Sequence, residues 1–275
     1  MIEALIPLLR GVAVNAAIAA GRLIRDGFGK APQVDAAFPH DLKLRLDRAC
    51  EEEILRVLRM SFPGHAVLSE EKGFEPGRER YLWIVDPLDG TVNFHHGIPF
   101  FCTSIACYEI ADEAVRRTGF RIPDGRKLGV PILGIVYDPL RDELFTGTAG
   151  YGASLNRVSL PAPEATRLDE SVVALSFGAR EESIAYMSRV LPALTLEARK
   201  VRSFGSTALD MVQVAAGRIG AFVQMGTNLW DFAAAAIVVR EAGAIVDVKE
   251  YAPGRFRIIA SATGIFEQIR CQAEG

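Results

Sequence analysis

Two aspartates, Asp86 and Asp89, directly follow the apolar run 83–85 and are separated from each other only by Pro87 and Leu88. Asp and Pro are ordinary turn residues, so the simplest interpretation of this stretch is a surface turn. A buried carboxylate, however, is costly unless it is paired, hydrogen-bonded or bound to a metal. The stretch therefore raises the question of whether its two carboxylates hold a cation.

Further acidic residues stand where apolar elements are expected to begin or end. Glu70 follows a short predicted strand, Asp231 begins a predicted helix, and Asp47 lies near the start of another. Taken singly, Asp47 and Asp231 could cap their helices, and Glu70 could belong to a solvated charged loop. Strand ends can converge at one edge of a sheet, however, and ligands of α/β folds bind outside such ends. If Glu70 and Asp231 converge with the first two aspartates, the four carboxylates need cations, and two Mg²⁺ ions fit because Mg²⁺ prefers carboxylate oxygens.

The residues between and after the two aspartates suit such a site. Pro87 fixes its own φ and stiffens the link, and the backbone carbonyl of Leu88 can face the site as a neutral oxygen ligand. Gly90 and Thr91 open a short predicted helix, whose free N–H groups would receive a phosphate. The Thr91 hydroxyl could orient an attacking water. Two metal ions about 3.5–4 Å apart suit in-line attack on a phosphoryl group.

The apolar pattern predicts the elements that would position these groups. In residues 1–157 it predicts an antiparallel sheet with helices on one face, from helices at 2–28 and 46–58, strands at 66–68, 81–85, 101–108 and 132–137, and a hairpin at 144–156. In residues 158–275 it predicts a second, α/β lobe, from strands at 172–175, 221–224, 245–248 and 257–260 alternating with helices at 183–191, 207–216 and 231–242. No flexible linker separates the halves, so we expect two lobes packed tightly as one unit.

Composition narrows the classes of partner. The chain has 275 residues, of which 49% are apolar and 24% charged, with a net charge of −3. This balance gives no reason to expect nucleic acid or an anionic membrane as the main partner. The N-terminus lacks a signal-peptide pattern, and no stretch reaches the ~18–20 uninterrupted apolar residues of a membrane span. The four cysteines, without a C-x-x-C pair, are predicted to be reduced core thiols of a cytosolic protein: Cys50, Cys102, Cys107 and Cys271.

Two separate signatures make the chain similar to the inositol monophosphatase family of Mg²⁺-dependent, lithium-sensitive phosphatases. The first is WIVDPLDGTVNF at 83–94, and the second is WDFAAA at 230–235, followed by Glu241-Ala242-Gly243. Supporting stretches lie at 69–71, 134–139, 150–153 and 202–206, so the resemblance covers nearly the whole chain. It implies an α+β / α/β fold, the layered α-β-α-β-α sandwich of the inositol monophosphatase and fructose-1,6-bisphosphatase type, which is usually dimeric.

The resemblance also implies which residues hold the ions. Glu70, Asp86 and the carbonyl of Leu88 would bind the first Mg²⁺. Asp86, Asp89 and Asp231 would hold the second. Two or three Mg²⁺ ions are therefore expected in all.

For the reacting groups, the resemblance implies that Thr91, supported by Asp47, orients the attacking water, which Glu70 helps to activate. The N–H groups of Gly90 and Thr91 would bind the phosphate. The alcohol portion of the substrate would lie against Gly205, Ser206, Thr207 and Gln224.

Three departures from the family concern the substrate. Gln224 stands where inositol-preferring members carry an acidic residue, so inositol specificity is in question. The loop 34–40 lacks the lysine common there, and Leu42-Lys43-Leu44 replaces the usual Val-Thr, which puts loop closure and a third ion in question. A basic insertion, Arg116 to Lys127, is either a solvated loop or a loop that selects substrate or forms an interface.

The sequence thus predicts a cytoplasmic homodimer that hydrolyses a small phosphorylated alcohol, such as inositol 1-phosphate, with Mg²⁺ and direct attack of water. Alternative substrates are fructose 1,6-bisphosphate, histidinol phosphate and a 3′-phosphonucleotide. An alternative of another class is a regulatory protein that binds the RNA-processing and transcription machinery, as some bacterial members of the family do. A membrane partner is not expected.

Overall fold

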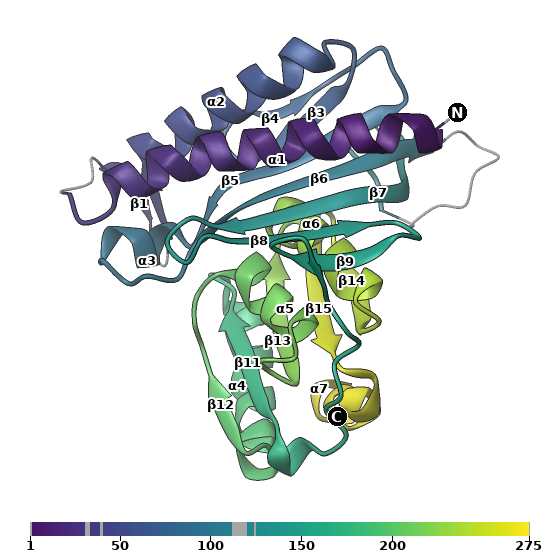
Figure 1. The fold of residues 1–275 in the computed structure, drawn as a ribbon. Coiled ribbons are helices and arrows are strands. Elements are labelled where there is room, and N and C mark those ends of the chain that lie inside the picture. The colour runs from purple at the N-terminus through teal and green to yellow at the C-terminus, as the bar shows by residue number, and fades with distance from the viewer. Residues whose placement is uncertain (1, 31–33, 39–40, 112–119, 124, 275) are drawn as a thin grey trace.

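The computed structural model describes residues 2–30, 34–38, 41–111, 120–123 and 125–274. The strands of this part of the chain form an eight-stranded sheet, a five-stranded sheet and a separate two-stranded hairpin. Helices cover the outer face of each sheet and also fill the space between the sheets (Figure 1). The layers therefore run α-β-α-β-α, which confirms the sandwich expected from the resemblance.

The first half of the chain builds the large sheet and the two helices outside it, α1 (Ile2–Gly27) and α2 (Arg45–Ser61). Neighbouring strands are antiparallel except β3 and β5, which are parallel. A hairpin of β1 (Val34–Phe38) and β2 (Asp41–Leu44) precedes α2, and α3 (Thr91–His95) follows β5. In spatial order the sheet consists of β10 (Val158–Ser159), β9 (Gly152–Leu155), β8 (Glu143–Thr148), β7 (Lys127–Asp138), β6 (Cys102–Ala111), β5 (Tyr81–Asp89), β3 (Ala66–Ser69) and β4 (Gly73–Glu75).

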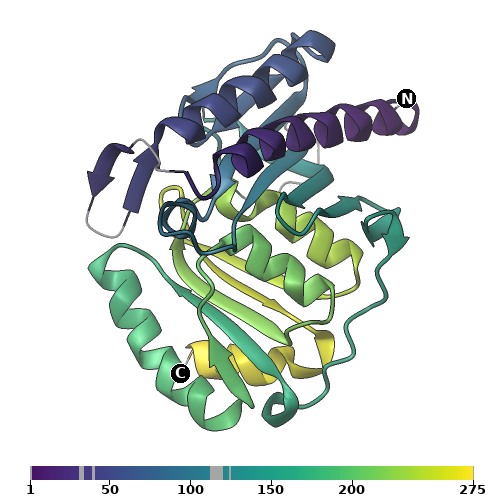
Figure 2. The ribbon, with the colours of Figure 1, turned by 60° about the vertical axis from the view of Figure 1, so that its left-hand side comes forward.

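The second half builds the small sheet and the other four α-helices of the described chain. Figure 2 shows α4 (Glu181–Glu197) and α7 (Phe266–Glu274) on the far side of the small sheet from α1 and α2. Short 3₁₀ helices lie at Leu168–Glu170 and Thr263–Ile265. In spatial order the small sheet consists of β12 (Lys200–Arg202), β11 (Val172–Phe177), β13 (Ala221–Thr227), β15 (Arg255–Ser261) and β14 (Ile245–Ala252).

The middle layer consists of α5 (Thr207–Ala215) and α6 (Leu229–Glu241), which contact both sheets. The prediction that helices cover only one face of the first sheet is therefore wrong. The central strand β5 is buried along seven successive residues, as expected for a strand with both faces covered. The helices on this second face come from the other half of the chain, so the pattern of residues 1–157 alone did not reveal them.

Two glycines let α6 approach the large sheet at backbone distance. A Cβ added to Gly134 of β7 would lie 2.2 Å from the carbonyl oxygen of Ala234, and one added to Gly147 of β8 would lie 2.7 Å from the Cα of Val238. The alanines at 233–236 of α6 have small side chains, which also permits this close contact. This close packing fixes the N-terminus of α6, and with it Asp231, beside the large sheet.

The helix α1 is long and apolar enough to cross a membrane by length and composition alone. The core helix of a soluble protein meets the same criterion. Here Leu9, Ala13, Ala17 and Ile24 of α1 are fully buried in the cluster that also contains residues of the large sheet. In this fold α1 is a core helix.

Two sequence predictions need correction or limits. Cys271 is exposed on α7, so the prediction of a core thiol fails there, while the other three cysteines are buried. In the basic insertion, residues 116–119 and 124 lie outside the described part of the chain. Of its described residues, Phe120 packs edge-to-face on Phe256 with ring centroids 4.9 Å apart, and Ile122 is buried. Phe120 and Ile122 thus anchor this part of the insertion on the core, while Arg121 and Pro123 are exposed, and the role of the loop stays a prediction.

Candidate functional site

A cavity of about 190 Å³ lies where the edge of the large sheet meets the N-termini of α5 and α6. It contains all four carboxylates whose convergence the sequence analysis considered. Its wall consists of Glu70, Asp86, Leu88, Asp89, Gly90, Thr91, Val92, Gly205, Thr207, Asn228 and Asp231.

The parallel pairing of β3 and β5 brings the first two carboxylates together. Ser69 pairs with Val85, and the backbone N–H of Glu70 donates to the carbonyl of Val85 at 3.2 Å. Because parallel strands end at the same edge of a sheet, Glu70 and Asp86 emerge side by side. The sheet therefore places these carboxylates without help from the loops.

A β-bulge places the next carboxylate. Asp86 pairs with Ser104 and Asp89 with Cys102, so β5 carries one residue more than β6 across this interval. Pro87 has no N–H to give to the ladder, which favours a break in pairing at this point. Asp86 is only 2% exposed, so the surface turn considered from composition is excluded. The strand expected to end at Val85 continues to Asp89.

The N-termini of α5 and α6 supply hydrogen bonds to the remaining carboxylates. Oδ2 of Asp89 accepts hydrogen bonds from the Ser206 hydroxyl and the Ala208 backbone N–H, both at 2.7 Å. Oδ2 of Asp231 accepts from the Thr227 hydroxyl at 2.6 Å and from the Asn228 backbone N–H at 2.7 Å. Negative charge is stabilised at such helix starts, so the middle layer both holds and partly neutralises these two groups.

The cluster as a whole still lacks positive charge. Burial and then the neighbouring carboxylates raise the pKa of Glu70 and of Asp86 well above their usual values, with only Lys43 opposing this for Glu70. Burial raises the pKa of Asp89 to about 7, against the lowering effect of its hydrogen bond from Ser206. Burial likewise raises the pKa of Asp231. Raised values of this kind mean that the cluster takes up protons or cations.

The donor set fits Mg²⁺ by its chemistry. Carboxylate and carbonyl oxygens are the hard ligands this ion prefers, and Leu88 adds its carbonyl to the four carboxylates of the wall. Within the described residues, no three His, Cys, Asp or Glu side chains already stand as the shell of an ion. Asp89 and Asp231 each have one oxygen held by protein donors. The cavity thus offers separate oxygens of the right kind and not a closed cage.

Three residues predicted for the site do not line the cavity. Asp47 caps α2, its Oδ2 accepting the Leu44 backbone N–H at 2.7 Å, although its charge contributes to the raised pKa of Glu70. Ser206 is buried and bonded to Asp89. Gln224 is 6% exposed and accepts the Thr207 hydroxyl at 2.8 Å, so it stands behind Thr207. None of the described residues of the basic insertion lines the cavity.

Thr91 opens α3 at the cavity, and its predicted support by Asp47 stays a prediction. The Thr91 hydroxyl donates to the carbonyl of Leu88 at 3.0 Å. Gly90, which precedes it, has φ +98, and a Cβ there would lie 3.0 Å from the Phe100 carbonyl oxygen. Only glycine fits this left-handed, crowded position, which opens α3 toward the cavity.

The sequence analysis missed Asn228. This residue caps α6, and its Oδ1 accepts a hydrogen bond from Arg255 at 2.6 Å. Through this contact Arg255 lies close enough to lower the pKa of Asp231 slightly against burial. An Asn three residues before an Asp at a helix start is a capping pattern, so the sequence did carry a signal for it.

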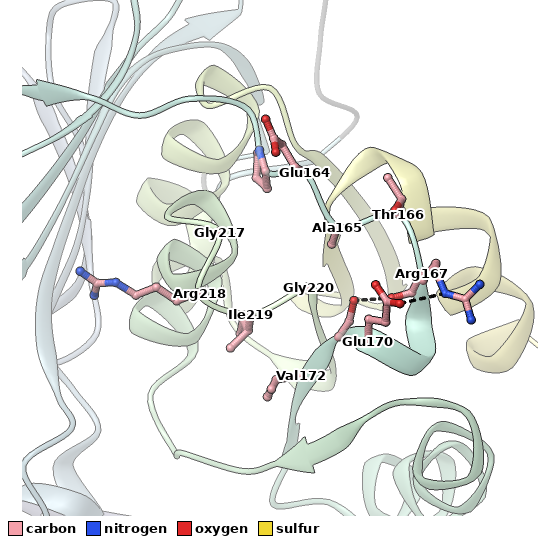
Figure 3. A pocket seen from close by; sticks show the side chains of 12 residues that line it. Glu164, Ala165, Thr166, Arg167, Glu170, Val172, Gly217, Arg218, Ile219 and Gly220 are labelled. Atoms are coloured by element: carbon pink, nitrogen blue, oxygen red, sulfur yellow. Dashed lines mark hydrogen bonds and ion pairs between the residues drawn. The ribbon is translucent and has the colours of Figure 1, made fainter.

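A larger hollow of about 370 Å³ lies elsewhere, beside the segment that links the two halves of the chain. Its arginines do not face a common point, and Figure 3 shows Arg218 and Arg167 extending in opposite directions. Arg218 is bound to Glu143 at 2.5 Å, and Arg167 to Asp169 at 2.5 Å. Both arginines are thus already paired with carboxylates, and the acidic cavity, which gathers four carboxylates, remains the candidate site.

A sequence profile described as the inositol monophosphatase family matches residues 8–116 and 127–273. The match is interrupted at 117–126, inside the segment that the sequence analysis set apart as an insertion. Among characterised proteins, the chain is 37% identical over 245 residues to the Nus factor SuhB of Escherichia coli K12, covering 87% of this chain and 84% of that protein. It is 36% identical over 244 residues to inositol monophosphatase 1 of Solanum lycopersicum, covering 86% and 82%.

Solved structures agree with these sequence matches. The crystal structure of the extragenic suppressor protein SuhB from Bartonella henselae superposes with a TM-score of 0.85 at 32% identity, covering 97% of this chain and 98% of that one. The structure of inositol monophosphatase from Anabaena superposes with a TM-score of 0.77 at 32% identity, covering 95% and 93%.

Proposed function

Because this chain belongs to the inositol monophosphatase family, we propose that it hydrolyses a small phosphate monoester in a Mg²⁺-dependent reaction. The observation that carries the proposal is the convergence of four carboxylates with raised pKa values in one cavity. A protein gains nothing in stability from such a cluster unless cations occupy it. An anionic substrate then binds to the ions, although the chain has a net charge of −3.

Five residues would hold the metal ions in this proposal. Glu70, Asp86 and the Leu88 carbonyl form one set, and Asp86, Asp89 and Asp231 form the other. Bound Mg²⁺ would supply the positive charge that neutralises carboxylates and phosphate and lowers the pKa of water. The carbonyl of Leu88 already accepts the Thr91 hydroxyl, and its second lone pair leaves it able to serve as a ligand.

The remaining residues of the wall orient the reactants. The Thr91 hydroxyl, held by the Leu88 carbonyl, would orient the attacking water, and the N–H groups of Gly90 and Thr91, which line the cavity, would bind the phosphate. Glu70 shares in activating that water by accepting its proton, the role that the family resemblance implies. Water attacks phosphorus directly and the bond to the alcohol oxygen breaks. That oxygen takes up a proton from solvent and leaves as the alcohol, inorganic phosphate is the other product, and no covalent enzyme intermediate forms.

The lining of the cavity is compatible with a small alcohol as the leaving group, and an activity assay must identify which alcohol it is. Gly205 and Thr207 form the wall on the alcohol side, and Gln224 is reached only through Thr207. Because the Thr207 hydroxyl donates to the Gln224 amide oxygen, Gln224 acts first on the orientation of Thr207. We therefore place inositol 1-phosphate beside fructose 1,6-bisphosphate, histidinol phosphate and a 3′-phosphonucleotide as candidate substrates.

A release assay for inorganic phosphate tests the proposal. Purified protein is incubated with each of these four phosphates, with Mg²⁺ and with EDTA. We expect Mg²⁺-dependent release from at least one of them, and a loss of about 10³-fold or more in Asp89→Asn, since removing one metal-holding charge weakens both binding and transition-state stabilisation. Unchanged far-UV circular dichroism of Asp89→Asn is the control for folding. Protein that releases phosphate from none of the panel contradicts the proposal.

A second role is suggested by the similarity to proteins named Nus factor SuhB. We propose that the chain also binds a component of the transcription machinery, in the cytoplasm. A pull-down with Asp89→Asn separates this role from catalysis, because a binding surface outside the cavity survives the loss of activity. If transcription proteins are absent from the pull-downs of both wild type and variant, the second role is contradicted. Light scattering of the purified protein tests the predicted homodimer.

A further inference from the structure

One buried side chain of the first signature ties the two halves of the molecule together. Asn93 of α3 is 8% exposed, and its Nδ2 donates hydrogen bonds to two backbone carbonyls, that of Phe100 at 2.8 Å and that of Phe204 at 2.7 Å. Phe100 belongs to the segment between α3 and β6, whereas Phe204 precedes α5. Both protons of one amide are therefore used to join segments 104 residues apart in the sequence.

The segment around Phe204 is shaped to meet this amide. Gly205 has φ +90, and a Cβ on it would lie 3.1 Å from Nδ2 and 3.2 Å from Oδ1 of Asn93. The rings of Phe100 and Phe204 stack with centroids 5.0 Å apart, on the same two residues whose carbonyls the amide holds. The left-handed glycine and the stacked rings leave the segment little freedom to move away from Asn93.

The same segment delivers the donors that hold Asp89. Directly after Gly205, the Ser206 hydroxyl and the Ala208 backbone N–H both donate to Oδ2 of Asp89 at 2.7 Å. The Cys102 thiol also approaches this oxygen, at 3.9 Å. The protein thus holds Asp89 by Oδ2, and a further hydrogen bond from the Thr207 backbone N–H lowers the pKa of the same carboxylate.

We infer that Asn93 is a positioning residue for Asp89, acting through the Phe204 carbonyl and the start of α5. The inference rests on the proposed function, since it concerns the affinity of the same cavity for Mg²⁺. Asn93 sits in the first half of the chain with Asp89, whereas the donors to Asp89 come from the second half. By holding Phe204, two residues before Ser206 and four before Ala208, Asn93 fixes the direction in which the carboxylate faces the cavity.

Only a double donor can serve in this place, because both partners of Nδ2 are carbonyl oxygens. Asn93→Asp keeps the size and replaces the donor by an acceptor. It also adds a negative charge near the cluster, which by itself would strengthen cation binding. Weaker binding in Asn93→Asp therefore reports the lost position and not the changed charge. Asn93→Ala removes the donor without a new charge, and Asn93→Ser keeps a single donor.

The experiment measures Mg²⁺ binding to the substrate-free protein by isothermal titration calorimetry, together with the melting temperature of each variant. We expect Asn93→Ala and Asn93→Asp to bind Mg²⁺ about 10- to 100-fold more weakly than wild type, the usual effect of removing a group that orients a ligand. Asn93→Ser is expected to fall between them and wild type.

Asn156→Asp is the matched control. Asn156 also spans two segments with its amide, donating to the Asp142 carbonyl at 2.9 Å and accepting the Leu144 N–H at 2.8 Å, but in a hairpin outside the cavity. Its φ of +49 is one that Asp tolerates as well as Asn. This variant is expected to lower the melting temperature while binding Mg²⁺ within about twofold of wild type, because it leaves every group of the cavity in place.

Ser206→Ala tests the route. If Asn93 acts through the start of α5, the loss of affinity in Asn93→Ala combined with Ser206→Ala is smaller than the product of the single losses. Losses that multiply contradict the route, and wild-type affinity in folded Asn93→Ala contradicts the inference itself. Wild-type protein that binds no Mg²⁺ contradicts the proposed function and the inference together, so the two failures are distinguishable.

Discussion

At the scale of single residues, the candidate site depends on carboxylates that the fold keeps out of water. Asp86 is 2% exposed, and burial is the largest cause of the raised pKa in Glu70, Asp86, Asp89 and Asp231. The side chains that oppose this effect are few: Lys43 for Glu70, Ser206 for Asp89, and Thr227, Asn228 and Arg255 for Asp231. Metal-free protein therefore holds a strained cluster, which protons or cations relieve.

This strain predicts an unusual dependence of stability on pH. The folded-state pKa of Asp89 is raised to about 7, above the value of about 3.9 for Asp in an unfolded chain. The folded state then binds more protons than the unfolded state, so its stability is largest below the unfolded pKa and falls as the pH rises through the folded pKa. In EDTA, the melting temperature of wild type is expected to fall from pH 5 to pH 8 relative to Asp89→Asn, which lacks this group.

Mg²⁺ should reverse the effect at pH 8, since an ion that binds only the folded state stabilises it and replaces the protons. Scanning fluorimetry across this range, with and without Mg²⁺, provides the measurement. A wild-type melting temperature that runs parallel to that of Asp89→Asn in EDTA would show that the carboxylate is not strained.

At the scale of elements, α6 has two structural roles. It brings Asp231 to the large sheet, and it covers the inner face of that sheet. Its approach depends on Gly134 and Gly147, whose Cα atoms face the backbone of the helix. Gly134→Ala would force the two layers apart. We expect it to lower the free energy of unfolding by about 1–3 kcal/mol, the usual effect of overpacking a core, and to weaken Mg²⁺ binding by displacing Asp231.

Gly11→Ala is the control for that substitution. Gly11 lies in α1 with nothing within 4 Å of an added Cβ. Alanine is favoured over glycine in a helix by about 1 kcal/mol, so this variant should be as stable as wild type or more stable. Urea denaturation of both variants checks the prediction, and equal effects of the two substitutions would show that the approach of α6 to the sheet is not critical.

At the scale of the whole molecule, the two halves of the chain share one core. The main cluster of buried side chains includes Ile84 and Val136 of the large sheet, Val238 of the middle layer and Phe222 of the small sheet. The lobes 1–157 and 158–275 remain a prediction about how the chain is organised. We expect them not to unfold separately, since separating one lobe from the other would expose the inner faces of both sheets.

The chain contains one tryptophan in each half, which makes this expectation measurable. Trp83 is fully buried in β5, and Trp230 lies in α6. The single-tryptophan variants Trp83→Phe and Trp230→Phe report on the two halves separately by fluorescence during urea unfolding. For each variant, we expect the fluorescence curve to coincide with its curve from circular dichroism. A fluorescence transition that precedes the loss of circular dichroism in either variant would show that one lobe unfolds alone.

The sequence by itself determined which residue types form the site and which family the chain resembles, because contiguous stretches of the chain carry both signals. Residues 83–94 contain Asp86, Leu88, Asp89, Gly90 and Thr91 within one strand and the turn after it, and all five line the cavity. Long helices with clear apolar periods, such as α1 and α2, were also predicted correctly. The strands β1, β4, β10 and β12 were not, since strands of five residues or fewer are defined by their partners and carry little pattern of their own.

Only the tertiary structure decided which of these groups meet. It placed Gln224 behind Thr207, put Asn228 on the cavity wall, and covered the large sheet on both faces with helices from both halves of the chain. It also joined Asn93 to Phe204, a contact between distant segments that no local pattern announces. The physical reason is common to all of these: a hydrogen bond or a close approach between distant residues depends on how layers pack, and packing is a property of the whole chain.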